Sequence, residues 1–313
     1  MLRLYVISLL TCFFIAYMVI EWGETFFSIL IIQPFLFIVL ILNAERIDIF
    51  SNKKLGIFHA AKGNALAAIG SLLVPGRVTE LLKPIYYKTK VNLSISEGLS
   101  IVLLERIFDI FIVTLMLLGL ALFMPTYGIG QYIPPYLLIS IILAFTLLLI
   151  LVAFYPYFFT NIIRIITRGR LRAWLIEMFD HFHKGLPQGL SIKQVLLTIT
   201  VWFGSWLTYW IFLQFDGQIA LSWSASLSVF LAATFGLALT ITPGGIGTFE
   251  AIVSTLLITY GYTWESALIS TIGLRIASFL PNLILALYTV CFEGFDLIME
   301  MRIKAKSSGG LDE

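Results

Sequence analysis

The sequence predicts an all-α, polytopic helical membrane protein with six to eight spans, forming a single integral membrane domain over residues 1–313. Hydrophobic residues make up 59% of the chain and charged residues only 12%, about half the charged share of a soluble domain. The mean hydropathy is +0.97. A bilayer accepts this much apolar surface, whereas a water-soluble fold could not bury it.

Six apolar runs are predicted to cross the membrane. Most are near the ~17–25 residues that span the ~30 Å hydrocarbon core. They are residues 4–20, 26–42, 107–124, 136–155, 195–215 and 266–292. The first run lacks a small-x-small cleavage site and is followed at once by the second. We therefore interpret it as a retained span rather than a signal peptide.

Two Pro/Gly breaks predict re-entrant or broken helical hairpins. Residues 63–74 reach about half way across the membrane, at ~1.5 Å per residue, and residues 78–87 then lead away from a break. Residues 223–241 meet a second break, which residues 249–260 leave. The predicted breaks are Pro75, Gly76, Pro243, Gly244, Gly245 and Gly247. The second hairpin is either re-entrant or two full spans, so the total remains open.

The two breaks also predict an inverted repeat with units at about 58–124 and 223–292. Arg106 follows Pro75 by 31 residues, and Arg275 follows Pro243 by 32 residues. Charge topology makes the first hairpin open inward and the second outward. Inverted repeats with broken helices are typical of transporters that expose a midplane site alternately to each side. The alternative is that two breaks arose by chance in a Gly-rich membrane protein.

The positive-inside rule predicts that both termini are cytoplasmic in a cell membrane. Basic residues gather at 46–90, 156–193 and 302–306, whereas residues 125–135 are uncharged. Within the second basic region, residues 158–186 show the spacing of an amphipathic helix. We expect this segment to lie on the cytoplasmic membrane surface. A calmodulin-like partner site is the weaker interpretation.

Charged residues at membrane depth define the candidate site, because each costs about 2.5–3.5 kcal/mol at a helix centre. Guanidinium groups and helix N-termini after the breaks suit a lipid phosphate. We expect phosphate binding by Arg77, Arg106, Arg275 and Lys83, with Glu80, Glu105, Asp109 and Glu250 as polar partners or proton carriers. Arg106 and Asp109 should meet at three residues' separation, and Glu105 should repel Asp109 unless a cation lies between them. The alternative is structural ion pairing and snorkelling.

Other ligands are not expected. The histidines are His59, His181 and His183, and no Cys, Asp or Glu cluster completes a metal site around them. Cys12 and Cys291 lie in apolar runs and are interpreted as core thiols. No Walker motif is present, so ATP is not used directly. We predict no catalytic residue, no cofactor, no metal and no nucleic-acid partner, and the oligomeric state remains open.

Three motifs together resemble the lysylphosphatidylglycerol synthase membrane region, also called the flippase-like domain. They are Val-Pro-Gly-Arg-Val-Thr-Glu at 74–80, Leu-Glu-Arg-Ile-Phe-Asp at 104–109 and Pro-Gly-Gly-Ile-Gly-Thr-Phe-Glu at 243–250. The resemblance covers essentially the whole chain. It implies movement of lipids with modified or glycosylated headgroups. It does not imply lysyl transfer, which in that family belongs to an additional soluble domain.

The leading hypothesis is therefore a flippase-like transporter for an anionic lipid, working by alternating access. The lipid would be an aminoacylated phospholipid or a polyprenyl-phosphate-linked sugar. One alternative is an integral-membrane transferase on a lipid-linked sugar, using the loop acids Glu21, Glu24 and Asp216. Another is a non-catalytic membrane partner of a glycosyltransferase or lipid synthase, docked through the basic surface helix.

Overall fold

The computed structural model describes residues 2–74, 77–123, 134–216, 221–238 and 242–308, and not the side chains of residues 2–22, 77 and 294–308. Over these ranges the chain is helical, without a β-strand, so the predicted all-α class is confirmed. Pro75 and Gly76, two of the predicted break residues, lie outside the described residues.

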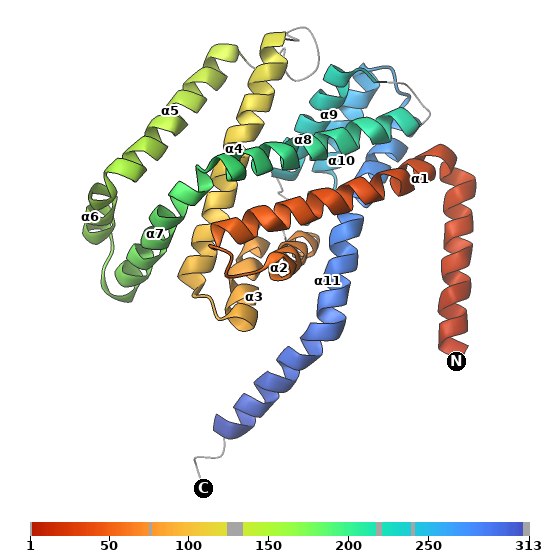
Figure 1. Ribbon diagram of the computed structural model, residues 1–313. Helices are drawn as coiled ribbons and strands as arrows, with labels where there is room; N and C mark the ends of the chain where they lie inside the picture. Colours follow the sequence, from red (N-terminus) through yellow and green to blue (C-terminus); the bar gives the residue numbers. More distant parts are fainter. Residues whose placement is uncertain (1, 75–76, 124–133, 217–220, 239–241, 309–313) are drawn as a thin grey trace.

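Figure 1 shows the helices in chain order. They are α1 (Leu2–Phe50), α2 (Ile57–Gly70), the 3-10 helix η1 (Arg77–Leu81), α3 (Leu82–Val91), α4 (Ile95–Phe123), α5 (Pro135–Phe154), α6 (Pro156–Ile166), α7 (Gly169–Gly189), α8 (Ile192–Phe215), α9 (Trp223–Ala238), α10 (Thr248–Thr259) and α11 (Trp264–Ser308). By length and composition, four segments in the described part can cross a membrane: Gly23–Phe50, Pro135–Phe154, Ile192–Phe215 and Trp264–Glu293. Together with the composition, they make this an integral membrane protein.

The first two predicted spans are two arms of α1. The arms meet at Gly23, whose backbone leaves helical geometry at φ 38° and ψ −105°. Glycine tolerates this positive φ because it has no Cβ. The second arm continues past the predicted end at residue 42 as far as Phe50. Arg46, which we expected in a loop, therefore lies inside a helix.

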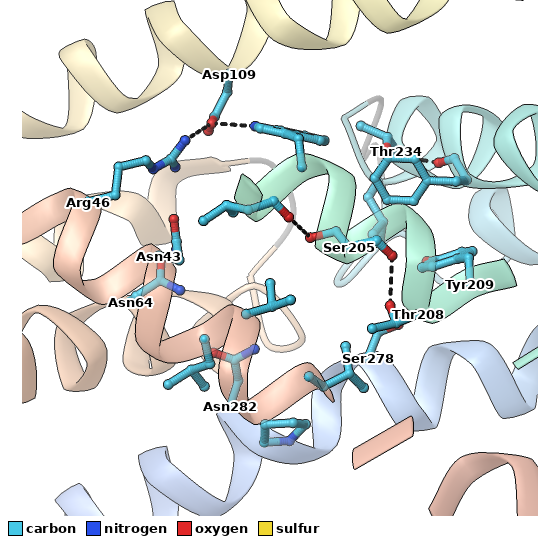
Figure 2. Close-up of a pocket in the computed structure, with 18 of the residues that line it drawn as sticks. Asn43, Arg46, Asn64, Asp109, Ser205, Thr208, Tyr209, Thr234, Ser278 and Asn282 are labelled. Carbon is cyan, nitrogen blue, oxygen red and sulfur yellow. Dashed lines mark hydrogen bonds and ion pairs between the residues drawn. The ribbon is translucent and has the colours of Figure 1, made fainter. Parts of the chain in front are cut away.

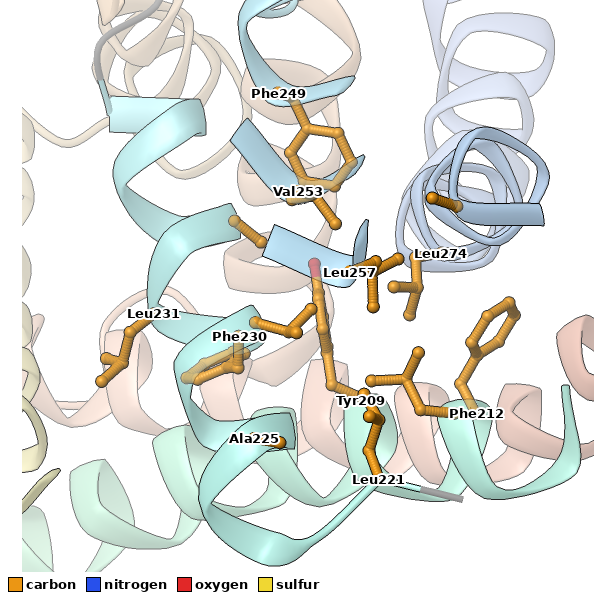
Figure 3. Packing of buried hydrophobic residues seen from close by; sticks show 14 of the residues in the cluster. Tyr209, Phe212, Leu221, Ala225, Phe230, Leu231, Phe249, Val253, Leu257 and Leu274 are labelled. Carbon is orange, nitrogen blue, oxygen red and sulfur yellow. The ribbon is translucent and has the colours of Figure 1, made fainter. Parts of the chain in front are cut away.

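The helices pack around two apolar cores. Helix α8 packs along the second arm of α1. Helix α11 contacts α1, α2 and α10 (Figure 1). One core gathers Phe212, Phe230, Phe249, Val253 and Leu257 between α8, α9 and α10 (Figure 3). The other joins the end of α1 to α2, α3, α4 and α7. Helix α5 buries little apolar surface in the protein, which is favourable when lipid covers the rest.

The segment 158–186 differs from the prediction of one surface helix. It forms two helices, α6 and α7, because the chain turns at Gly169 with φ 61°. The end of α7 is buried against α4: a Cβ at Gly185 would lie 2.6 Å from Leu104, and one at Gly189 would lie 2.6 Å from Phe108. Glycine has no side chain, so Gly185 and Gly189 allow α7 to approach α4 this closely. The amphipathic period alone does not predict this contact.

The second break is described in full, and its tip touches the first hairpin. Gly244, Gly245 and Gly247 take positive φ values of 62°, 72° and 88°. The Gly244 amide donates a hydrogen bond of 2.5 Å to the carbonyl oxygen of Ser71, just after α2. Each hairpin is followed by a long helix, α4 or α11. The same order of elements thus occurs twice, and the inversion of one unit relative to the membrane stays a prediction.

Candidate functional site

A charged cluster is centred on α4, in the interior of the protein. We use this name for Arg46 of α1, Glu80 of η1, Lys83 of α3, and Glu105, Arg106 and Asp109 of α4. Arg46 and Glu105 are each only 2% exposed, and Lys83 is 1% exposed. Buried charges of this kind need partners, because each loses its hydration.

Arg46 lies between the two carboxylates that were expected to repel each other. Its Nη1 is 2.5 Å from Oδ1 of Asp109, and its Nη2 is 3.5 Å from Oε1 of Glu105. The indole of Trp202 on α8 donates a further bond of 2.9 Å to the same Asp109 oxygen. The amide of Gln194 donates to the Arg46 carbonyl at 2.9 Å. The expected cation is therefore present, and it comes from α1.

Arg106 and Lys83 complete the cluster. The Arg106 Nε is 2.8 Å from Oε2 of Glu80, and its Nη1 is 3.2 Å from Oδ2 of Asp109. The Lys83 Nζ is 2.8 Å from Oε2 of Glu105. The cations Arg46, Lys83 and Arg106 thus face the carboxylates Glu80, Glu105 and Asp109. Cations and carboxylates are equal in number, so the cluster is formally neutral.

Arg275 and Glu250 pair at the second break, apart from this cluster. The Arg275 Nη1 donates to Oε1 of Glu250, and its Nη2 donates to the carbonyl of Gly244. The other Glu250 oxygen accepts the Gly247 amide at 2.7 Å, capping α10. The Arg275 guanidinium also lies 5.2 Å from the ring centre of Phe249. Arg275 therefore stabilises the conformation of the second break at residues 243–250.

The two pairings repeat one pattern. In each unit, an arginine inside the long helix binds the glutamate that follows the helix break: Arg106 binds Glu80, and Arg275 binds Glu250. The spacing of arginine and break in the sequence already suggested that the units correspond. The matching ion pairs support that correspondence with geometry that spacing alone does not provide.

Two cavities meet at Arg106. The central cavity has a volume of about 320 Å³ and is bordered by α1, α2, α4, α8, α9 and α11 (Figure 2). The tip cavity, of about 270 Å³, is lined by Ser71, Glu80, Lys83 and Gly244. Asn64, Arg106 and Leu237 line both. The side chain of Arg106 is 29% exposed and borders both cavities, and its Nη2 lies 3.7 Å from Oε1 of Glu105.

A third hollow is apolar. It has a volume of about 260 Å³ and lies between α4, α5 and α8, with Phe111, Phe145 and Val195 among its lining residues. Ile107 and Phe108 line it from α4, next in sequence to the charged Glu105 and Arg106. One helix therefore borders polar and apolar space at the same level.

Five of the eight predicted charged residues come together in the cluster: Glu80, Lys83, Glu105, Arg106 and Asp109. Arg275 and Glu250 form a separate pair and line neither polar cavity. The side chain of Arg77 lies outside the described residues. Arg46 was missed, because its charge was interpreted as the end of a span. The signal was available, since no Gly or Pro interrupts the chain between Pro34 and Gly56.

Asp216, which the sequence placed among the acids of the short loops, lies at the end of α8 and is buried. It caps α8 and is 0% exposed. The Thr25 hydroxyl donates to it at 2.7 Å, and the Ser270 hydroxyl donates to its other oxygen. Because burial disfavours the charged form, the pKa of the Asp216 carboxyl is raised. The two hydroxyl donors compensate the buried carboxyl for part of its lost hydration.

Comparison with protein families gave one result: the family described as lysylphosphatidylglycerol synthase TM region matches residues 5–286. The matched range contains the charged cluster, both helix breaks and the Arg275–Glu250 pair. The comparisons with curated proteins and with solved structures gave no match.

Proposed function

The chain belongs to the family of the lysylphosphatidylglycerol synthase TM region, and on this premise we propose that it moves an anionic lipid across the membrane by alternating access. The family is a membrane domain often linked to flippase-like function. The lipid would be an aminoacylated phospholipid or a polyprenyl-phosphate-linked sugar. We propose the cytoplasmic membrane as its location, with both termini on the cytoplasmic side.

The observation that carries the proposal is the central cavity with the charged cluster in its wall. Ionised side chains in the wall of a cavity of about 320 Å³ inside a membrane protein are costly to maintain, and such charges mark substrate pathways. Of the cluster's cations, Arg106 is the accessible one, because Arg46 and Lys83 are almost fully buried. A guanidinium fork binds phosphate oxygens in pairs. We therefore place the lipid phosphate at Arg106.

The proposed movement uses the ion pairs at the two breaks. A phosphate that binds Arg106 competes with Glu80 for the same guanidinium, which loosens the first hairpin from α4. The corresponding pair in the second unit, Arg275 with Glu250, holds the other hairpin. The two tips touch through Gly244 and Ser71. Alternate release of the two pairs would open the cavities to one side and then to the other.

The apolar hollow fits the other end of the ligand. Phe111, Phe145 and neighbouring aliphatic side chains line a space of about 260 Å³ that an acyl or prenyl chain would fill. We propose that the lipid straddles α4, with its headgroup at Arg106 and part of a chain in this hollow. Movement would follow a lipid gradient, or protons carried by Glu80, Glu105, Asp109 or Glu250.

The test is transbilayer movement in vesicles that contain the purified protein and fluorescent anionic phospholipids. A membrane-impermeant reductant added outside reports the fraction of lipid that reaches the outer leaflet. We expect Arg106→Gln to lower the rate about tenfold, equivalent to roughly 1.4 kcal/mol. Lys193→Gln is the control, because it breaks an exposed pair of 2.8 Å with Glu45.

A second variant separates function from folding. Arg106→Gln with Glu80→Gln removes one charge of each sign, so the cluster stays balanced and should fold. This variant should still move lipid slowly, because the phosphate ligand is gone. Wild-type rates in both Arg106 variants, or no lipid movement by the wild-type protein, would refute the proposal.

A second candidate is a membrane partner of a glycosyltransferase or lipid-modifying enzyme. The observation that favours it is the exposed basic surface of α6 and α7, which carries Arg164, Arg168 and Arg170. Such a surface attracts anionic lipid or an acidic protein face. Co-purification of an enzyme whose activity falls when these arginines become glutamine would support this role. For the transferase alternative, Asp216 is no longer available as an accessible acid, because it is buried.

A further inference from the structure

A second group of ion pairs joins α11 to the first hairpin, which runs from α2 to α3. Glu293 is the last residue of the part of α11 that can cross a membrane. Lys62 Nζ on α2 donates to its Oε1, and the Tyr86 hydroxyl on α3 donates to its Oε2 at 3.0 Å. Lys90 Nζ on α3 lies 3.7 Å from the same Oε2. We call these four residues the Glu293 group, and none of them belongs to the charged cluster.

The contact between α11 and the hairpin is hollowed beside the Glu293 group. A hollow of about 190 Å³ lies there, with Leu66 of α2, Thr89 of α3 and Val290 of α11 among its lining residues. Helices in protein interiors are usually close-packed, with few gaps larger than a water molecule. At this level the polar contacts of Glu293 therefore carry much of the attachment between α11 and the hairpin.

The Glu293 group is also more accessible than the charged cluster. The side chains of Glu293 and Lys90 are 19% and 21% exposed, whereas those of Glu105 and Lys83 are 3% and 2% exposed. Two ammonium groups face one carboxylate, so the charges of the group do not balance. Ion pairs that water can reach separate at a lower cost than buried pairs. The Glu293 group can therefore open while the charged cluster stays intact.

Pro281 gives α11 a place to bend between Arg275 and the Glu293 group. Proline has no N–H, so the Ala277 carbonyl, four residues earlier, lacks its usual helical donor. The Gln33 amide of α1 lies 3.4 Å from that carbonyl, a longer contact than its bond of 2.9 Å to the carbonyl of Ile29. Kinks in long helices are typically found at such prolines. The last part of α11 can therefore move relative to the part that carries Arg275.

The movable part of α11 borders the central cavity. Pro281 and Asn282 line that cavity from α11, and Asn64 lines it from α2. Glu293 follows Asn282 by eleven residues, about 16 Å along a helix at ~1.5 Å per residue. Residues 282–293 thus lead from the cavity to the end of the membrane-spanning segment, and α11 packs against α2 (Figure 1).

We propose that the Glu293 group is the lock of a gate between α11 and the first hairpin, on one side of the central cavity. While its ion pairs hold, residues 282–293 lie against the hairpin and close the cavity on that side. When the pairs separate, this segment bends at Pro281 and opens it. The inference rests on the proposed function and adds the control of access to its site. The basic residues Lys62 and Lys90 place this gate on the side expected to be cytoplasmic.

The test measures how fast a thiol in the central cavity reacts. Ser205→Cys, in a protein whose Cys12 and Cys291 are alanine, places one cysteine in the cavity lining. The protein in micelles is treated with a charged methanethiosulfonate reagent, and the modified fraction is followed by mass spectrometry. Adding Glu293→Gln should raise the reaction rate at least about fivefold, because the open form becomes more populated. An unchanged rate would overturn the lock.

Two controls separate opening of the gate from general loosening. Glu97→Gln breaks the pair of 2.6 Å with Lys54, between the end of α1 and α4, and should leave the rate at position 205 unchanged. Ser254→Cys in α10 is 1% exposed and lines neither polar cavity, so Glu293→Gln should leave its reaction slow. An equal rise at positions 205 and 254 would mean partial unfolding and would contradict the proposal.

A charge swap tests the pair itself. Lys62→Glu with Glu293→Lys exchanges the two charges and keeps their sum, so an ion pair can form again. The swapped protein should react at position 205 more slowly than Glu293→Lys alone, by at least about threefold, as expected for coupled residues. Equal rates in the single and swapped variants would show that this pair does not control access.

Bridging the gate tests its role in transport. Lys62→Cys with Glu293→Cys, joined by a bismaleimide, should stop lipid movement in vesicles, whereas the same variant treated with N-ethylmaleimide should still move lipid. Lys54→Cys with Glu97→Cys is the control pair, and bridging it should change the rate little. Equal lipid movement by the bridged and unbridged protein would refute the lock. If the wild-type protein moves no lipid, the transport proposal fails, and the reaction at position 205 still decides whether the gate exists.

Discussion

Replacing Arg46 with methionine tests whether the charged cluster depends on its balance. Arg46 is 2% exposed and joins Asp109 at 2.5 Å and Glu105 at 3.5 Å. At an effective dielectric constant of about 20, one such contact is equivalent to ~4 kcal/mol. Methionine fills similar space, so the loss is electrostatic, and removing one partner of a buried pair costs about 3–5 kcal/mol. We expect Arg46→Met to lower the free energy of unfolding by that amount.

The assay is equilibrium unfolding in mixed micelles with increasing dodecyl sulfate, followed by circular dichroism. Lys54→Met is the matched control, because it breaks a cation–carboxylate pair of 2.6 Å with Glu97 in which the lysine side chain is 51% exposed. Exposed pairs contribute about 0–1 kcal/mol, so this control should change stability little.

A double variant isolates the pair from general damage. Asp109→Asn removes one carboxylate but keeps an oxygen for the Trp202 indole. Arg46→Met with Asp109→Asn restores equal numbers of charges, so it should cost at least about 1–2 kcal/mol less than the sum of the single variants. Additive losses within ~0.5 kcal/mol, with Arg46→Met no worse than Lys54→Met, would refute the account of the cluster.

Three further predictions concern the breaks and the buried polar groups, each measured as unfolding in the same micelles. Gly244→Ala should lower the free energy of unfolding by about 1–3 kcal/mol and slow lipid movement. The reason is that φ is +62° and the added Cβ would lie 2.7 Å from the Leu72 side chain. Gly119→Ala is the control: no atom lies within 4 Å of its added Cβ, so it should be neutral or slightly stabilising. Trp202→Phe should cost about 1.5–3 kcal/mol through its lost bond to Asp109. Burial raises the pKa of Asp216 above its unfolded value, so its contribution is favourable at low pH and is lost as pH rises through the folded pKa. Asp216→Asn should flatten the decline in stability that begins as pH rises above the unfolded value of about 3.9.

The helical class and the second break could be predicted because both depend on local chemistry. Long apolar runs need a bilayer, and Pro243 with three nearby glycines interrupts a helix wherever it lies. The turn between α6 and α7 was not predicted, although its signal was available: Thr167-Arg168-Gly169-Arg170 interrupts the apolar pattern after Ile166, and Gly169 takes a positive φ. The burial of the end of α7 depends on Gly185 and Gly189 meeting α4, a contact between distant segments.

The candidate site was predicted in its α4 part and missed in its α1 part. Arg106 and Asp109 are three residues apart on one helix, so their contact follows from helical geometry. Arg46 is 63 residues from Asp109, and hydropathy ends the span before it reaches that arginine. A charged residue is tolerated inside a membrane helix when an oppositely charged residue of another helix binds it. A single sequence does not reveal that partner. The same reason explains the buried Asp216.

Cross-linking from the central cavity tests most directly whether a lipid headgroup enters it. Ser205→Cys, in a protein whose Cys12 and Cys291 are alanine, would be exposed to a phospholipid that carries a thiol-reactive headgroup. The control is Ser254→Cys, which is 1% exposed in α10 and lines neither polar cavity. We predict a cross-link at position 205 that excess unlabelled phosphatidylglycerol suppresses. Equal labelling of both positions, or none at position 205, would contradict the proposed lipid site.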